Sequence, residues 1–572
     1  MDAAASNFAA ISKINQLRLQ PSILPSATTT TPRKLLRVNF PRPSTVPLIT
    51  ESAGSIHAGR LEYFKHVLRK MGHRRQHGYE SLAMVDAVQR VGLDHHFHDE
   101  IEEVLHNHHF IASLADGVAS PELQSLHEVA LSFRLLRQQG YPVPADVFGR
   151  FKDKHGRFNQ EVGKDVKGLM ELYEASQLGV DGEDIIAEAE AYSSQFLRQL
   201  EPLLDHHQAI AVRHTLTQPH HKNIARFNAL NYLHNYQGAN TWVHVLQDLA
   251  KLDFDLVQSL YKQELQQVSK WWWDMGLSKE LEHVRDQPVK WYTFGIACIE
   301  DPSLSQERVE LTKPVAMIYA IDDVFDVYGT IEELTFFTEA VDRWDYALVE
   351  KLPDYMRLCF RVLDDMINEI SHRVETLHGW NPARSLRKPW GIICKAFLVE
   401  AKWFHSKTLP KSEEYLANGI RSSGVPVILV HLFFLLGQNI NTNTVEEIDR
   451  LPEIISSTAT ILRLWNDVGS ARVEDREGND GSFVEVYMKE HGKEGREEAA
   501  KAMDEAMRRV SEAWKRLNRE NLSPSPFSSS PFSRGSLNLA RLVPLLYSFS
   551  ERRSLPLLEE FINCVIYEPA TL

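Results

Sequence analysis

The sequence VAMIYAIDDVFD, residues 315–326, places three carboxylates at the end of an apolar run. Buried like charges repel one another, so such a cluster needs either a cation or water beside it. On a helix, Asp322 and Asp326 lie one turn apart on one face, and two carboxylates on one face suit Mg²⁺. Asp323 points away from that face and is expected to act behind the ligands. Alone, this motif fits a solvated acidic helix end equally well.

A second polar pattern follows another apolar stretch, residues 458–465. Asn466, Ser470 and Glu474 are spaced four and four, which stacks them on one helical face. Their amide, hydroxyl and carboxylate oxygens form a hard ligand set of lower charge. Inside a helix, Ser and Asn side chains can instead bond back to the backbone. Because both patterns follow apolar helices, we favour a shared metal site over two solvated helix faces.

Two arginines are candidates for holding an anionic group beside these metals. Arg463 precedes Asn466 by three residues and flanks the same face, and Arg285 lies upstream in the segment 284–288. Guanidinium groups bind phosphate oxygens bidentately, and fixed cations stabilise charge that develops on a departing diphosphate. The carbocation left behind needs a dry, aromatic pocket. The aromatic candidates for its wall are Trp291, Tyr292, Phe294, Phe325 and Tyr547.

Composition excludes several classes of function. The chain has 572 residues, of which 43% are hydrophobic, and this length favours two domains. A formal net charge of -14 gives no nucleic-acid signature. Four widely spaced cysteines argue against a disulfide framework or a cysteine zinc site. No run of 18 apolar residues is present, so no membrane span is expected.

The spacing of apolar residues predicts an all-α protein. From residue 55 onward apolar residues recur at intervals of three and four, and no sustained alternating strand pattern is found. We expect a first helical domain over 55–257 and a metal-binding catalytic domain over 258–572. Residues 1–54 are basic, rich in Ser, Thr and Pro, and almost free of acids, which is typical of a plastid transit peptide. An ordinary N-terminal extension, with the cytosol as the location, is the alternative.

These motifs resemble the plant terpene synthase family over nearly the whole chain after residue 55. The segments LSFRLLRQQGY (131–141) and DVKGLMELYEAS (165–176) are similar to the family's N-terminal domain, and LTK (311–313) leads to the aspartate motif as in its catalytic domain. The resemblance implies a catalytically silent N-terminal double-helical barrel and a C-terminal class I terpenoid synthase bundle. It also implies three Mg²⁺ ions, with Mn²⁺ as a substitute. The implied metal ligands are Asp322, Asp326, Asn466, Ser470 and Glu474.

The same resemblance implies the roles of the remaining site residues. Arg285, Arg463 and Asp322 are the expected catalytic residues. The substrate, a prenyl diphosphate, is expected to be bound by Arg285, Asp322, Asp326, Arg463 and Asn466. Neither a nucleic acid nor a membrane is an expected partner, and a monomer is expected.

Three departures from the family pattern suggest reduced cyclisation. The arginine pair that many cyclising relatives follow with a tryptophan is incomplete, because Arg74-Arg75 has no such partner and the first tryptophan is Trp242. The family's Arg-x-Arg motif reads Arg285-Asp286-Gln287, and the segment 547–552 lacks the aspartates of sesquiterpene cyclases. The chain resembles the subfamily that makes acyclic alcohols. Geranyl diphosphate would give linalool, and farnesyl diphosphate would give nerolidol.

Other functions stay open at this point. Loss of a proton in place of water addition would give an acyclic olefin such as myrcene or ocimene. A chain-elongating prenyltransferase would normally carry two aspartate-rich motifs, and a non-enzymatic calcium-binding scaffold would not place oxygen ligands after apolar helices. The histidine-rich stretches 94–98, 106–109 and 220–221 raise the question of zinc. Because no cysteine lies nearby, we expect these histidines on helix surfaces.

Overall fold

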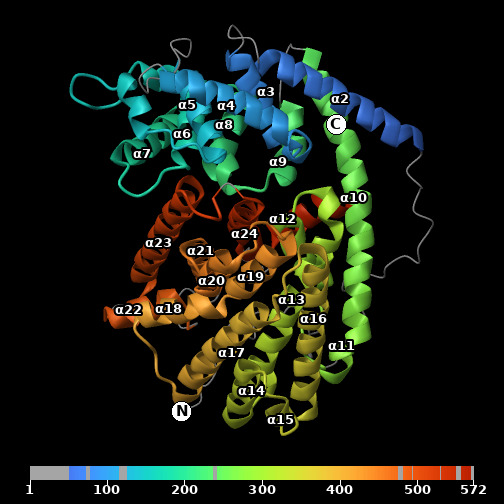
Figure 1. Ribbon diagram of the computed structural model, residues 1–572. Helices are drawn as coiled ribbons and strands as arrows, with labels where there is room; N and C mark the ends of the chain where they lie inside the picture. Colours follow the sequence, from blue (N-terminus) through green and yellow to red (C-terminus); the bar gives the residue numbers. More distant parts are fainter. Residues whose placement is uncertain are drawn as a thin grey trace, which may run out of the picture.

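The computed structural model describes residues 51–72, 78–114, 125–235, 241–473, 481–492, 494–528, 530–548 and 555–568. Regular structure in these ranges is helical, apart from an isolated antiparallel bridge between Lys152 and Phe158. The predicted all-α fold is therefore confirmed, and Figure 1 shows two helical layers of the chain, one above the other. The expected transit-like segment, 1–54, lies outside the described residues except for 51–54, which begin the first helix, α2.

The N-terminal domain packs short helices around three apolar clusters. Local signals start these helices: Ser125 and Glu128 form a capping box for α5, and Asp165 caps α6. The elements are α2 (Glu51–Gly72), α3 (Gly78–Arg90), η2 (Asp94–His96), α4 (His98–Leu114), α5 (Leu126–Gln138), η3 (Ala145–Phe151), η4 (Val162–Lys164), α6 (Val166–Ser176), α7 (Asp184–Leu200), η5 (Glu201–Leu203), α8 (His206–Thr217), η6 (His220–Lys222) and α9 (Ala225–Asn235).

One long helix, α10 (Thr241–Met275), runs beside both domains (Figure 1). Its first half packs against α2, and its second half packs against α12 and α13 of the catalytic domain. The expected border between residues 257 and 258 falls inside this unbroken helix. The chain therefore passes from one domain to the next without a linker at that point, and the domain limits stay a prediction.

The C-terminal domain surrounds a single large apolar cluster. Ser530 caps α24, so the loop that the sequence suggested over 523–536 ends earlier than expected. The elements are α11 (Leu277–Glu280), α12 (Pro288–Cys298), η7 (Pro302–Leu304), α13 (Ser305–Asp323), η8 (Val324–Tyr328), α14 (Ile331–Arg343), α15 (Tyr346–Val349), α16 (Asp354–His378), α17 (Ala383–Ser406), α18 (Ser412–Ser422), α19 (Val425–Leu436), α20 (Thr442–Asp449), α21 (Glu453–Val473), α22 (Phe483–Glu490), α23 (Arg496–Leu522), α24 (Pro531–Tyr547), α25 (Pro556–Ile562) and η9 (Asn563–Tyr567).

A stretch over α18 and α19, Ser412–Leu436, is long and apolar enough to cross a membrane by length and composition. However, 78% of its most apolar window is buried inside the protein. The two helices are also separated at Gly424, whose φ of +79° breaks the helical path. Burial on all sides is typical of a core helix, and the apolar composition serves the core here.

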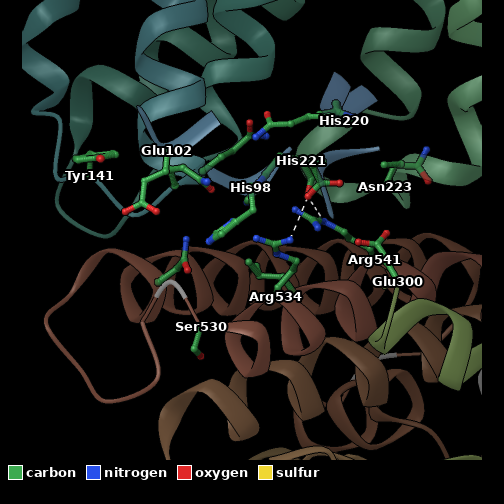
Figure 2. A pocket seen from close by; sticks show the side chains of 17 residues that line it. His98, Glu102, Tyr141, His220, His221, Asn223, Glu300, Ser530, Arg534 and Arg541 are labelled. Carbon is green, nitrogen blue, oxygen red and sulfur yellow. Dashed lines mark hydrogen bonds and ion pairs between the residues drawn. The ribbon is translucent and has the colours of Figure 1, made fainter. Parts of the chain in front are cut away.

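Polar contacts and a cavity separate the two domains. His221 Nε2 lies 2.8 Å from Asn518 Oδ1 on α23, and Arg541 donates to the His221 carbonyl at 2.7 Å. Beside them lies a cavity of about 240 Å³, with histidines on one side and Arg534 and Arg541 on the other (Figure 2). The expectation that His220-His221 lies on a helix surface is wrong for His221, which is 2% exposed. It was placed wrongly because periodicity within one helix does not reveal packing between domains.

Candidate active site

The aspartate motif lies at the mouth of a cavity of about 170 Å³ in the C-terminal domain. The helix α13 carries Asp322, and it continues into η8, a π-helical turn that carries Asp326. Both carboxylates line the cavity, as their shared helical face predicts. The widening to a π-helix is a feature that the sequence did not indicate. Thr330 and Glu333 form the capping box of α14, so the helix ends before Thr330 as expected.

A buried ion pair fixes α13 against the long helix α10. The Arg308 guanidinium donates to both carboxylate oxygens of Glu264, at 2.9 and 2.7 Å, and neither side chain is exposed. Tyr292 also donates its hydroxyl to Glu264, at 2.6 Å. Since a buried charge needs a partner with good geometry, these bonds set how α13 lies beside α10. They hold the helix that presents Asp322.

Arg285 contacts the first two aspartates of the motif. Its Nη2 donates to Asp322 Oδ2 at 2.5 Å and to the Tyr319 carbonyl at 3.1 Å. Its Nε pairs with Asp323 Oδ1 at 2.7 Å, and Asp323 accepts the Arg285 backbone N–H at 2.8 Å. Asp323 is buried and does not line the cavity, so it supports Arg285 from behind. The expectation that Asp323 acts behind the ligands agrees with this geometry.

The helix α21 brings the second motif to the same cavity. Asn466 lines it, and Ser470 lies one turn further along and is buried. Glu474 lies outside the described residues, and its role as a ligand stays a prediction. Asp467, which the sequence places off the ligand face, is buried and accepts the Phe483 backbone N–H at 3.1 Å. Asp322, Asp326 and Asn466 thus border one cavity from different helices.

Arg463 lines the cavity one turn before Asn466 and is held by several partners. It donates to the Tyr415 hydroxyl, and its Nη1 lies 3.5 Å from Glu400 Oε1. Its Nε lies 3.3 Å from Asp467 Oδ1, and its guanidinium lies 4.7 Å from the centre of the Tyr415 ring. These contacts keep a cation in place before any anion arrives, which lowers the cost of reorganisation on binding.

The cavity carries more negative charge than its own side chains neutralise. Restricted access of water, together with the charge of Asp322, raises the pKa of the Asp326 carboxyl well above its ordinary value. Burial and nearby carboxylates also raise the pKa of Glu400. Carboxylates crowded in this way favour the binding of a divalent cation, and hard oxygen ligands suit Mg²⁺. The residues present therefore fit a magnesium site.

Apolar and aromatic side chains form the rest of the wall. Of the five aromatic candidates, Phe294 and Tyr547 line the cavity, whereas Trp291, Tyr292 and Phe325 do not. Trp291 packs against Trp272, with ring centres 4.7 Å apart, in the domain core. The apolar and aromatic lining side chains are Phe294, Val315, Ile318, Tyr319, Phe397, Trp403, Tyr415, Ile428, Leu462 and Tyr547.

Two charged lining residues were missed by reasoning from the sequence. Glu400 is the one carboxylate in the segment 396–404 of α17, and an isolated charge among apolar and aromatic residues was a usable signal. Lys290 follows Arg285 by five residues and also lines the cavity. Its Nζ lies 5.4 Å from the centre of the Tyr319 ring. It adds a cation on the side where Gln287 replaces an arginine of the resembling family.

Comparison with known proteins gives matches over almost the whole chain. The model "Terpene synthase, N-terminal domain" matches residues 41–216, and "Terpene synthase family, metal binding domain" matches residues 273–516. The (E)-nerolidol synthase TPS18VF of Cannabis sativa is 46% identical over 88% of this chain and 91% of its own length. The S-(+)-linalool synthase, chloroplastic, of Arabidopsis thaliana is 44% identical over 85% and 84%. Tricyclene synthase Oc15, chloroplastic, of Antirrhinum majus is 44% identical over 89% and 86%.

A solved structure shares both the fold and the arrangement of domains. Isoprene synthase from grey poplar leaves, in complex with three Mg²⁺ ions and dimethylallyl-S-thiolodiphosphate, superposes with a TM-score of 0.81. It is 34% identical, and the match covers 90% of this chain and 98% of that one. The correspondence includes the domain that carries the aspartate cavity.

Proposed function

This chain belongs to the terpene synthase family, and we propose that it converts geranyl diphosphate to the acyclic tertiary alcohol linalool, and farnesyl diphosphate to nerolidol. Membership confirms two expectations from the sequence: the chain is a lyase of the class that acts on prenyl diphosphates, and its catalytic domain binds metal. The single observation that carries the assignment to this cavity is that Asp322 and Asp326 border it together with Asn466 and Arg463.

The metal ligands that we propose are Asp322, Asp326, Asn466, Ser470 and Glu474. The isoprene synthase structure, with its three Mg²⁺ ions, supports the same number here. Bound Mg²⁺ would stabilise the negative charge of the departing diphosphate as a Lewis acid. Asp322 and Asp326 supply the fixed negative charge that attracts these cations to one side of the cavity.

Arg285, Arg463 and Lys290 surround the expected position of the diphosphate. Arg285 pairs with Asp322 in this structure, and a bound metal would take over that carboxylate. The guanidinium can then donate its N–H groups to phosphate oxygens. The allylic carbon–oxygen bond breaks with both electrons leaving on the diphosphate. Arg463, fixed by Tyr415 and Glu400, holds the departing anion near its place of release.

The apolar wall protects the allylic cation until one water molecule reaches it. Rings such as those of Tyr319 and Phe294 offer electron-rich faces without a competing nucleophile. The water oxygen forms a bond to the tertiary carbon, and its spare proton passes to the released diphosphate. The incomplete arginine pair at residues 74–75, which lies outside the described residues, supports quenching before ring closure. The nerolidol and linalool synthases at 46% and 44% identity support the same product class.

We further propose a plastid location. The basic, acid-poor composition of residues 1–54 and the chloroplastic relatives support it. Geranyl diphosphate is the expected substrate in that compartment. A fluorescent fusion of residues 1–54 should enter plastids, whereas a fusion of residues 55–572 should stay in the cytosol.

Product analysis in isotopic water tests the proposed reaction. The purified chain is supplied with geranyl or farnesyl diphosphate and Mg²⁺ in H₂¹⁸O, and volatiles are analysed by mass spectrometry. Linalool or nerolidol that carries one ¹⁸O atom is the expected product. Unlabelled olefins would show quenching by proton loss, a bicyclic or tricyclic product would show that ring closure is intact, and consumption of isopentenyl diphosphate would show chain elongation. Each of these results would overturn the proposed product.

A further inference from the structure

Imidazoles and a carboxylate meet where α2, η2 and α10 come together in the N-terminal part of the molecule. His96 Nε2 lies 2.8 Å from Asp253 Oδ1. The Nε2 atoms of His57 and His95 each lie 3.9 Å from the same oxygen. One ligand atom from each of His57, His96 and Asp253 lies within 4.8 Å of the other two. None of these residues lines the aspartate cavity.

Several ring nitrogens of this cluster are buried without a hydrogen-bond partner in the described part of the chain. They are Nε2 of His57 and both nitrogens of His95, whose side chain is 8% exposed. A buried polar atom that lacks a partner costs about 1–3 kcal/mol, and native proteins hold few of them. Here such atoms converge on one carboxylate oxygen. A ligand shared between them would satisfy them together.

The protonation states favour a metal as that ligand. Burial lowers the pKa of His95 to about 4, and burial also lowers the pKa of His57. Both rings are therefore neutral at pH 7 and keep a lone pair for coordination. Burial acts to raise the pKa of Asp253, but the charge of Arg226 and the hydrogen bond from His96 hold it below its usual range. The carboxylate is thus ionised beside neutral imidazoles.

We propose that His57, His96 and Asp253 form a binding site for a divalent transition-metal ion of the zinc class, with His95 as the fourth ligand. In a tetrahedral zinc site with bonds of 2.0–2.1 Å, neighbouring ligand atoms lie about 3.3 Å apart. The separations found here, from 2.8 Å up to a limit of 4.8 Å, enclose that value. Small rotations of the imidazole rings bring the ligand atoms to it.

The other oxygen of Asp253 is already held in a way that suits a metal ligand. Arg226 Nη2 donates to Asp253 Oδ2 at 2.8 Å, which turns Oδ1 toward the imidazoles. Partners behind a ligand commonly orient it in this manner. Nitrogen-rich ligands favour zinc-class ions, whereas the oxygen ligands around Asp322 favour Mg²⁺. The two sites therefore select different metals.

A metal at this position would connect elements that reach the catalytic domain. It would fasten α2 to α10, which runs beside both domains. It would also hold η2, where Asp94 pairs with Arg534 of α24 at 3.1 Å. Since α24 ends at Tyr547 in the wall of the active cavity, the site lies on a structural route between the domains. Its expected role is to hold the N-terminal helix in place.

Zinc binding to the complete, untagged chain tests this proposal. The protein is stripped with a chelator, returned to excess Mg²⁺ to fill the aspartate site, and equilibrated with Zn²⁺ before gel filtration and elemental analysis. We expect a single retained zinc per chain, and Co²⁺ in its place should give the intense visible absorption of a tetrahedral complex. His57→Ala and His95→Ala should weaken zinc binding roughly tenfold or more. His66→Ala is the matched control, because His66 is an exposed histidine of the same helix.

Terpene formation in Mg²⁺ reports whether each variant is folded, because His57 and His95 lie outside the active cavity. Loss of zinc with retained turnover supports the site. Failure of the wild-type chain to retain zinc, or a Co²⁺ spectrum of an octahedral complex, would overturn it whatever the variants do. Retention of zinc by a folded His57→Ala variant would also overturn it.

Discussion

Replacing Asp322 with asparagine separates the activity of the aspartate motif from its contribution to stability. The Asp322 side chain is 30% exposed, and its partner Arg285 keeps a second contact, 2.7 Å to Asp323. Arg285 is therefore not left without a partner. We expect the free energy of unfolding to fall by only about 1 kcal/mol, since partly exposed ion pairs contribute little. The midpoint of thermal unfolding should fall by about 4 °C or less.

The effect on turnover should be far larger. An amide oxygen is a weaker ligand for Mg²⁺ than a carboxylate, and the metal supplies several kcal/mol of stabilisation to the departing diphosphate. A loss of about 4 kcal/mol corresponds to roughly a 10³-fold fall in kcat/KM. Diphosphate release and volatile products, both measured across a Mg²⁺ titration, check this value. Part of the lost rate should return at high Mg²⁺ concentration, because the metal site is weakened and not removed.

Asp323→Asn is the matched comparison on the neighbouring residue. Asp323 is 2% exposed and bonds both the side chain and the backbone of Arg285. Removing one partner of a buried pair costs about 3–5 kcal/mol, so this variant should be the less stable of the two. It should keep more activity, because it supplies no metal ligand. If Asp322→Asn retains more than a tenth of wild-type turnover, or loses as much stability as Asp323→Asn, the proposed division of roles is wrong.

Three further predictions follow from individual contacts. A Cβ at Gly419 would lie 2.9 Å from Arg463 Cγ, so Gly419→Ala should displace that arginine and lower kcat roughly tenfold, while Gly59→Ala, which meets nothing within 4 Å, should have no effect. Lys290→Met should raise KM for the diphosphate about tenfold, and the fall in affinity should shrink at high salt. Burial raises the pKa of Glu174 to about 7 from 4.5, so the folded state binds its proton more tightly and stability should fall as pH rises through that window. Glu174→Gln should remove up to about 3 kcal/mol of this pH dependence, as urea unfolding at pH 5 and pH 8 would show.

The carboxylate cluster and the helical periodicity made the fold class and two of the metal ligands predictable. Spacing along one helix determines which side chains share a face, because the backbone geometry of a helix is local. Asp322 with Asp326, and Asn466 with Ser470, follow from this rule alone. The apolar runs that precede both motifs also indicated that these faces border the interior.

Contacts between helices were decided only by the tertiary structure. Glu400 lies on α17 and Lys290 on α12, and neither has a spacing relation to Asp322 that would place it in the same cavity. The grouping of His57, His96 and Asp253 likewise joins residues from three separate elements. The sequence by itself determined an all-helical lyase with a magnesium-binding aspartate face. Which side chains from distant helices complete each site depends on packing, since side chains far apart in the chain meet only when the helices that carry them are pressed together.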